Sequence, residues 1–287
     1  MKGKLTNLLL VLLFFSGLGL LLYPTVSDYY NSWLQSQAIA EYSQHVDQQA
    51  AEENRRQFEA AQSYNAALRA SGTSFYLPDN LAAEYRQQLN ASKLGVMAYI
   101  EIPVIGVTLP IGHGTGDDVL RDSIGHLEWS SLPVGGESTH CILSGHRGLP
   151  SSELFTNVDH MEIGDHFHLH VLDQKLTYRV DNIAVVEPTD HSLLGITQGK
   201  DYVTLVTCTP YGINSHRLLV RGVRVESEQA ADGSSALVNN ELHTISPTVV
   251  IPVVMAVLAA AIFLILLLDS GRKKYKGRRS VGKHEEV

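Results

Sequence analysis

The chain has 287 residues, of which 44% are hydrophobic and 18% are charged. This is the composition of a globular protein, and it excludes a disordered or collagen-like chain. Residues 24–245 hold 13 Lys and Arg against 27 Asp and Glu, a formal charge of −14. No nucleic-acid partner is expected, because nucleic-acid binding depends on cationic contacts to phosphate.

The first strongly apolar run covers residues 8–22 and follows two lysines. It reaches a workable length for a membrane span when residues 5–23 are counted. A cleaved signal peptide is the alternative, with a weak cleavage site at residues 25–27. Residues 1–23 are therefore interpreted as a membrane segment or a signal.

Residues 28–70 are predicted to be helical, because Ala, Gln and Glu dominate and both Gly and Pro are absent. Apolar side chains recur there at three- and four-residue steps, which is typical of one buried helix face. Either a helical stalk or a set of packed helices fits this pattern. A loop follows, in which Phe75 and Tyr76 are aromatic residues with an exposed appearance. The region 24–94 is thus expected to be helical with a lid-like loop.

From residue 96 the sequence changes to short runs typical of strands, separated by Gly, Pro, Asp and Asn. Strands are expected over residues 96–102, 107–111, 140–144, 166–172, 176–186, 202–208 and 217–225. Helical turns are expected at residues 117–120 and 152–155. Seven or eight strands in about 130 residues indicate a mostly β fold, a closed or nearly closed barrel.

The second apolar run, residues 249–268, carries no charge and is long enough to cross a hydrocarbon core of ~30 Å. Six cations within residues 272–279 indicate a cytoplasmic tail, and they suit anionic lipid headgroups. The expected layout is a linker at 227–245, a transmembrane helix at 246–271 and a basic tail at 272–287. Both ends are then cytoplasmic, and the domain between them faces outward at the cell membrane.

Cys208 ends a predicted strand directly before a turn, a rigid and accessible position that suits a nucleophile. A buried structural cysteine is the alternative. The other cysteine is Cys141, so the pair forms either a disulfide or one reactive thiol and one buried thiol.

Two further residues suggest chemistry at the ends of strands. His146 stands between two glycines just past a strand, where it can orient or protonate a partner. Arg217 lies nine residues after Cys208, and a hairpin would return it to that cysteine. A fixed cation there can stabilise a thiolate or an oxyanion.

Three histidines, His166, His168 and His170, alternate along one predicted strand. Their Cα atoms would span about 13 Å, so one metal ion could reach two of them but hardly all three. The polar face of a half-buried strand explains the pattern, and no metal site is expected.

The runs Gly-His-Arg-Gly-Leu-Pro, Thr-Leu-Val-Thr-Cys-Thr-Pro and His-Arg-Leu-Leu-Val-Arg-Gly together resemble the sortase family, and within it the pilus-building class C members. The resemblance covers the expected catalytic domain, residues 95–226. It implies an eight-stranded sortase barrel with short helices and transmembrane helices at both ends. It implies His146, Cys208 and Arg217 as the catalytic set, with no cofactor. Ser144 and Thr207 are candidates for substrate contact.

The chemistry implied by this resemblance is transpeptidation of a Leu-Pro-x-Thr-Gly-like (LPXTG-like) sorting signal between Thr and Gly. The thioester would pass to a lysine amine of a pilin, or to a cell-wall amine. A sortase that anchors single surface proteins is the alternative within the family. A plain cysteine peptidase and a catalytically silent, membrane-tethered binding module are the alternatives outside it.

Class C sortases usually carry an Asp-Pro-aromatic lid before the barrel, and this chain has no Asp-Pro-Phe or Asp-Pro-Trp. Residues 75–79 are the nearest match, with Phe75 and Tyr76 as lid candidates. The sortase arrangement would also place Cys141 about 16 Å along its strand from the site. That distance disfavours a disulfide with Cys208.

Overall fold

The computed structural model describes residues 2–72, 75–90, 92, 94–226, 255–260 and 263, with side chains from residue 9 onward. The chain forms two compact units. One comprises residues 1–29 and 239–287, and the other comprises residues 30–238.

Helix α1 (Lys2–Gln48) continues through Pro24 without a break. Its segment Leu9–Gln48 is long and apolar enough to cross a membrane, judged by length and composition alone. In the same unit, the ring of Phe14 stacks on that of Phe263 with centroids 4.3 Å apart. Residues 255–260 are helical. The rest of the expected C-terminal transmembrane helix, the linker and the basic tail lie outside the described residues.

The region predicted as one helical stretch contains two helices, because α1 ends at Gln48 and α2 (Ala51–Ala70) begins three residues later. Residues 30–48 of α1 and helix α2 pack on the barrel rather than forming a stalk. The hydroxyl of Tyr42 donates to the carbonyl of Met97 at 3.2 Å and accepts from the amide of Leu172 at 2.7 Å. Asn65 on α2 bonds both the amide and the carbonyl of Leu132.

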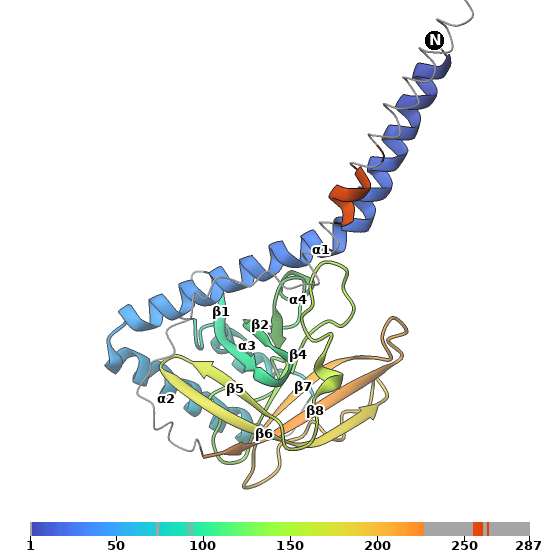
Figure 1. Ribbon diagram of the computed structural model, residues 1–287. Helices are drawn as coiled ribbons and strands as arrows, with labels where there is room; N and C mark the ends of the chain where they lie inside the picture. Colours follow the sequence, from blue (N-terminus) through green and yellow to red (C-terminus); the bar gives the residue numbers. More distant parts are fainter. Residues whose placement is uncertain are drawn as a thin grey trace, which may run out of the picture. The chain divides into compact units, whose positions relative to one another are not determined.

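Eight strands form a closed barrel in the order β1-β2-β3-β4-β7-β8-β6-β5 (Figure 1). The strands are β1 (Val96–Ile102), β2 (Val107–His113), β3 (Ile124–His126), β4 (Thr139–Ser144), β5 (His166–Val171), β6 (Gln174–Val186), β7 (Asp201–Thr209) and β8 (His216–Val225). Seven of them were expected, with ends that agree to within two residues. The eighth, β3, has three residues, too few for an alternating pattern to be visible in the sequence.

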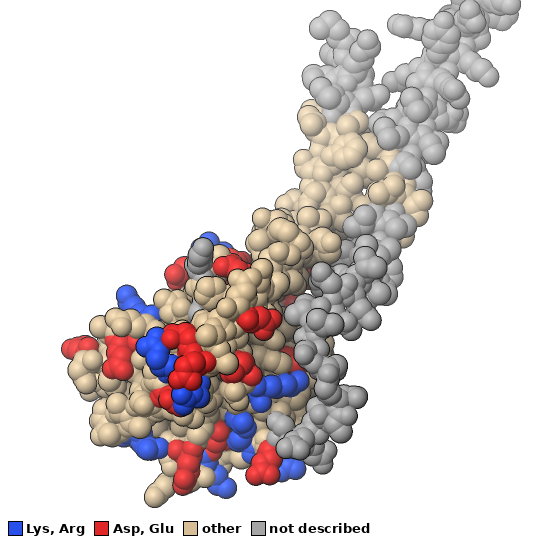
Figure 2. Space-filling view, turned by 90° about the vertical axis from the view of Figure 1, so that its left-hand side faces the viewer, with Lys and Arg blue, Asp and Glu red and all other residues tan. Residues whose placement is uncertain are grey.

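Short helices fill the connections: η1 (Pro103–Ile105), α4 (Asp117–Leu120), η2 (Val158–His160) and α3 (Asp79–Tyr85). The turn expected at 117–120 is α4. The prediction of a helical turn at 152–155 is wrong. Ser152 pairs with Leu149 in an isolated β-bridge, and the residues that follow form a non-helical turn. On the face that Figure 2 shows, Lys and Arg are interspersed with Asp and Glu, so neither sign forms a continuous patch there.

Helix α3 is tied to the barrel by a buried hydrogen-bond chain. The amide of Gly114 donates to the hydroxyl of Tyr85 at 3.0 Å, and that hydroxyl donates to Nδ1 of His126 at 2.9 Å. Nε2 of His126 then donates to the carbonyl of Ser131, also at 2.9 Å. The His126 ring is neutral in this arrangement, because burial disfavours its charged form and Nδ1 accepts the Tyr85 hydroxyl proton.

This burial predicts acid sensitivity of the fold. Burial lowers the pKa of His126 and that of His140 from 6.5 to about 4. Between pH 6.5 and pH 4 the unfolded chain therefore binds protons that the native protein excludes. The free energy of unfolding should fall as the pH drops through this window, by up to about 3 kcal/mol for each ring. Urea unfolding at pH 7.0 and pH 4.5 measures the change.

The matched variant is His126→Gln, which cannot take up a proton in this range. Its stability should be lower at pH 7 but should depend less on pH than that of the unchanged protein. An equal loss between pH 7.0 and pH 4.5 in both proteins would contradict the assignment to His126.

Candidate active site

The nucleophile candidate and the cation candidate lie on neighbouring strands. Strands β7 and β8 are antiparallel, and their register pairs Cys208 directly with Arg217. Both side chains are partly exposed, whereas the next residues into the barrel, Thr207 and Leu218, are buried. The hairpin thus brings a thiol and a guanidinium together at one open end of the barrel.

The third candidate, His146, reaches the same end through a parallel strand pair. Strand β4 runs alongside β7 up to the pair Ser144–Val206. The amide of Gly145 extends the ladder by donating to the carbonyl of Val206 at 3.1 Å. His146 and Cys208 are each two residues beyond that pair, on chains that lie about 4.8 Å apart where they are paired.

Gly145 permits this approach because any larger residue would collide with the core. A Cβ at this position would lie 2.7 Å from Cδ2 of Phe155 and 2.9 Å from Cγ2 of Ile124. Thr207 supports the same turn from β7, since its hydroxyl donates to the Gly145 carbonyl at 2.8 Å. Thr207 is buried, so its contact in the structure is with the backbone beside His146.

The guanidinium of Arg217 retains an uncompensated positive charge. Its Nη1 donates to the carbonyls of His216 at 3.1 Å and Asn214 at 3.4 Å. Within the part of the chain that the structure describes, Arg217 forms no ion pair with a carboxylate. A developing oxyanion next to Cys208 would therefore meet a cation that is held in place but not neutralised.

A cavity of about 260 Å³ lies beside this constellation. Arg217, Ser144 and Val206 form part of its wall, so the structure places the substrate-contact candidate Ser144 at the cavity. Apolar side chains form much of the remaining lining: Leu120, Leu127, Trp129, Val186, Leu194 and Leu219. An apolar cleft with a few polar groups in its wall suits a short peptide with an aliphatic side chain.

Comparisons with known proteins identify the family. A family model for the sortase domain matches residues 100–225. The chain is similar to sortase C1 from Streptococcus agalactiae, whose crystal structure is known, with 48% sequence identity and a TM-score of 0.65. The match covers 67% of this chain and 100% of that chain. The chain belongs to the sortase family. The resemblance found in the sequence is thereby confirmed.

A second solved structure, sortase C from Streptococcus pneumoniae, is 45% identical and has a TM-score of 0.60, with 66% of this chain and 97% of that one covered. Both structures are sortases C, which supports the class C interpretation of this sortase. Among curated relatives, Sortase D of Bacillus subtilis is 32% identical over 129 residues, 44% of this chain and 62% of that protein. The chain thus spans less than two thirds of that relative. Members of the family are cysteine transpeptidases, and Cys208 is the partly exposed cysteine of this sortase.

The two cysteines of the sortase differ sharply in environment. Both are free thiols in the structure. Cys141 pairs with Val203 inside the barrel, five residues before the level of Cys208. Burial, with a smaller contribution from Asp201, raises the pKa of the Cys141 thiol well above its ordinary value.

We therefore expect selective labelling of the native protein. Iodoacetamide at pH 8 should modify Cys208 and leave Cys141 unmodified, because the thiolate is the reactive form and Cys141 is both buried and protonated. Peptide mass mapping before and after unfolding in guanidinium measures this. Labelling of Cys141 at a rate similar to Cys208 in the folded protein would contradict it.

The lid candidates lie beside the cavity rather than on the nucleophile. The ring of Phe75 contacts Trp129 edge-on with centroids 5.3 Å apart, and it lies 4.9 Å from the ring of His191. Trp129 and His191 both line the cavity. Phe75 remains 43% exposed and Tyr76 73% exposed, so the contact is partial.

Such a contact should gate the site only mildly. Burying a whole aromatic ring contributes about 1.5–3 kcal/mol, and Phe75 is only about half-buried. Deletion of residues 73–79 should thus change the rate of peptide cleavage by less than about tenfold, and Phe75→Ala by less. Activation by a hundredfold or more in either variant would show that a strong lid exists without the Asp-Pro-aromatic sequence.

Two of the three alternating histidines, His168 and His170, contact neighbouring side chains on the barrel surface. His170 contacts Glu101 through Nε2 at 3.0 Å and stacks on Tyr99. Nδ1 of His168 contacts the hydroxyl of Thr177 at 3.1 Å, and burial lowers the pKa of His168 to about 4. No group of three potential metal ligands is present among the described residues.

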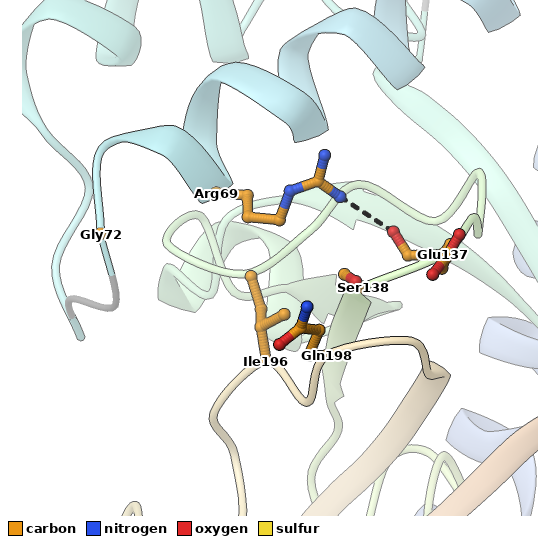
Figure 3. Close-up of a pocket in the computed structure, with 6 residues that line it drawn as sticks. All are labelled: Arg69, Gly72, Glu137, Ser138, Ile196 and Gln198. Atoms are coloured by element: carbon orange, nitrogen blue, oxygen red, sulfur yellow. Dashed lines mark hydrogen bonds between the residues drawn. The ribbon is translucent and has the colours of Figure 1, made fainter.

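A larger hollow of about 600 Å³ lies at the other end of the barrel (Figure 3). It is lined by Glu137 and Ser138, which immediately precede β4, whereas His146 follows the far end of that strand. In Figure 3 the Arg69 guanidinium donates to the Glu137 carbonyl, at 2.9 Å. The polar lining and the distance from Cys208 separate this hollow from the chemistry.

The sequence did not mark Trp129 or His191 as residues that line the cavity. Trp129 directly follows residues 125–128, and nothing else in the local sequence indicates that it lines a cavity. His191 lies in the long connection between β6 and β7, where no pattern distinguishes it from other loop residues.

Proposed function

We propose that this sortase is a transpeptidase in which Cys208 is the nucleophile, His146 the general acid and base, and Arg217 the oxyanion-stabilising cation. The observation that carries the proposal is that the three residues lie at the same height along the barrel, at the ends of neighbouring strands. Cys208 is paired with Arg217 in the β7–β8 register, and His146 continues the β4–β7 pair at the same height. No other cysteine in the chain is exposed, since Cys141 is buried.

The proposed substrate is an LPXTG-like sorting signal. The Cys208 thiolate attacks the carbonyl carbon of Thr, and the electron pair moves to the oxygen, which faces Arg217. The tetrahedral intermediate collapses as the Thr–Gly bond breaks, and His146 gives its proton to the leaving Gly amine. An incoming amine then loses a proton to His146, attacks the thioester and releases Cys208.

A pilin lysine is the proposed acceptor, with pilus polymerisation as the result. The support is the similarity to the Streptococcus pneumoniae sortase C, whose structure is described in terms of pilin substrate specificity. Anchoring of single surface proteins to a cell-wall amine uses the same residues and differs only in the acceptor. The proposed location is the outer face of the cell membrane, with α1 as the anchor.

The test is incubation of the full-length protein in detergent with a sorting-signal peptide and three acceptors: water alone, a pilin domain with its lysines, and a cell-wall peptide amine. Mass spectrometry then identifies the products. A branched conjugate between the Thr carbonyl and a pilin lysine supports the proposal. Exclusive conjugation to the wall amine would support the anchoring alternative, and hydrolysis alone would support a peptidase.

A further inference from the structure

Arg147 directly follows His146, and its side chain is only 9% exposed. A charged group so far out of water requires partners. Its Nη2 forms an ion pair with Asp159, and its Nη1 lies 3.3 Å from the hydroxyl of Thr209. The guanidinium carbon lies 5.9 Å from the centre of the Tyr211 ring.

These partners belong to the two segments that have to meet for catalysis. Asp159 lies in η2, within the connection from β4 to β5 that also holds His146. Thr209 is the residue after Cys208, and Tyr211 lies in the β7–β8 connection. The segments are closely apposed, because a Cβ on Gly148 would lie 3.0 Å from the Tyr211 ring.

The imidazole of His146 needs such support. Within the described residues no hydrogen bond reaches its ring, and its carbonyl is held by the amide of Phe155 at 3.1 Å. The ladder between β4 and β7 ends just before it, at Gly145. The orientation of His146 relative to Cys208 therefore depends on how its loop is fixed to β7.

We propose that Arg147 is a positioning residue that fixes the His146 loop against the end of β7 and so holds the imidazole at working distance from the Cys208 thiol. This inference rests on the roles proposed above for His146 and Cys208. A direct electrostatic effect of the cation on the thiol is the competing explanation. The two explanations assign different roles to Asp159. If Arg147 positions the loop, Asp159 anchors the guanidinium; if the cation acts directly on the thiol, Asp159 weakens that effect by offsetting the positive charge.

The test measures the rate of Cys208 alkylation by iodoacetamide from pH 5 to pH 9 in the full-length protein, with peptide mapping to identify the site. Arg147→Gln should slow alkylation at pH 7 about tenfold in the unchanged background and less than twofold in a His146→Gln background, since it acts through His146. Arg147→Lys should slow Cys208 alkylation nearly as much, because an ammonium group cannot contact three partners as the planar guanidinium does. Asp159→Asn should also slow alkylation, by about threefold or more.

The matched control is Arg221→Gln. Arg221 forms a partly buried ion pair with Asp181, at 2.9 and 3.0 Å, and lies opposite Thr204, four residues from Cys208 along β7. It should lose stability without changing Cys208 reactivity by more than twofold, and thermal unfolding of every variant should be recorded beside the rates.

Equal slowing by Arg147→Gln in both His146 backgrounds, or faster alkylation in Asp159→Asn with Arg147→Lys unchanged, would overturn the positioning role. The alkylation readout needs no sorting peptide. If transpeptidation fails while the effect of Arg147→Gln on alkylation still depends on His146, only the proposed function is refuted.

Discussion

Cys208→Ala should abolish both cleavage of the sorting peptide and transfer to an amine, with a loss of about 10⁴-fold or more. The reason is that the thioester cannot form without this thiol, and no other exposed cysteine lies at the open end of the barrel. Cleavage and conjugate formation should be followed by chromatography and mass spectrometry, with peptide and amine at saturating concentration.

Cys141→Ala is the matched control. It removes the other thiol from the barrel interior and leaves a small cavity, so a stability loss of about 1 kcal/mol is expected, with most activity retained at 25 °C. The opposite pattern, with Cys141 required and Cys208 dispensable, would reverse the assignment of the nucleophile.

Much of the barrel could be predicted because strand patterns are local. Alternation along residues 166–171 indicates a half-buried strand without knowledge of its neighbours. The pairing of Cys208 with Arg217 follows from counting across a hairpin. In contrast, β3 pairs over three residues only, and its position depends on β2 and β4 on either side.

Tertiary contacts account for what the sequence could not reveal. Arg147 and Thr209 are 62 residues apart, and nothing near either one indicates that they meet. The rings of Phe75, Trp129 and His191 likewise come from three distant segments. The closed strand order and the break between α1 and α2 also depend on packing against the barrel, which local propensity does not encode.

Arg217→Lys should reduce the rate of acylation about a hundredfold, the equivalent of about 2.7 kcal/mol. The substitution preserves the charge but not its geometry. The planar guanidinium of Arg217 donates to the carbonyls of His216 and Asn214 through one nitrogen, which leaves its other donors for the substrate. A lysine ammonium is a point charge on a flexible stem and cannot satisfy both sets of partners at once.

The loss should appear in kcat rather than in KM, because the oxyanion exists only in the transition state and the intermediate. Arg221→Lys provides the comparison, since it makes the same substitution four residues further along β8, where the guanidinium pairs with Asp181 and lies over the Tyr202 ring. We expect that variant to keep its rate to within about threefold, a factor worth less than 1 kcal/mol.

Near-native rates in Arg217→Lys would show that Arg217 contributes only its charge and that the geometry of its guanidinium is not needed. A rise in KM alone would assign Arg217 to binding of the substrate backbone, since the interaction lost would then be one made equally in the ground state and the transition state.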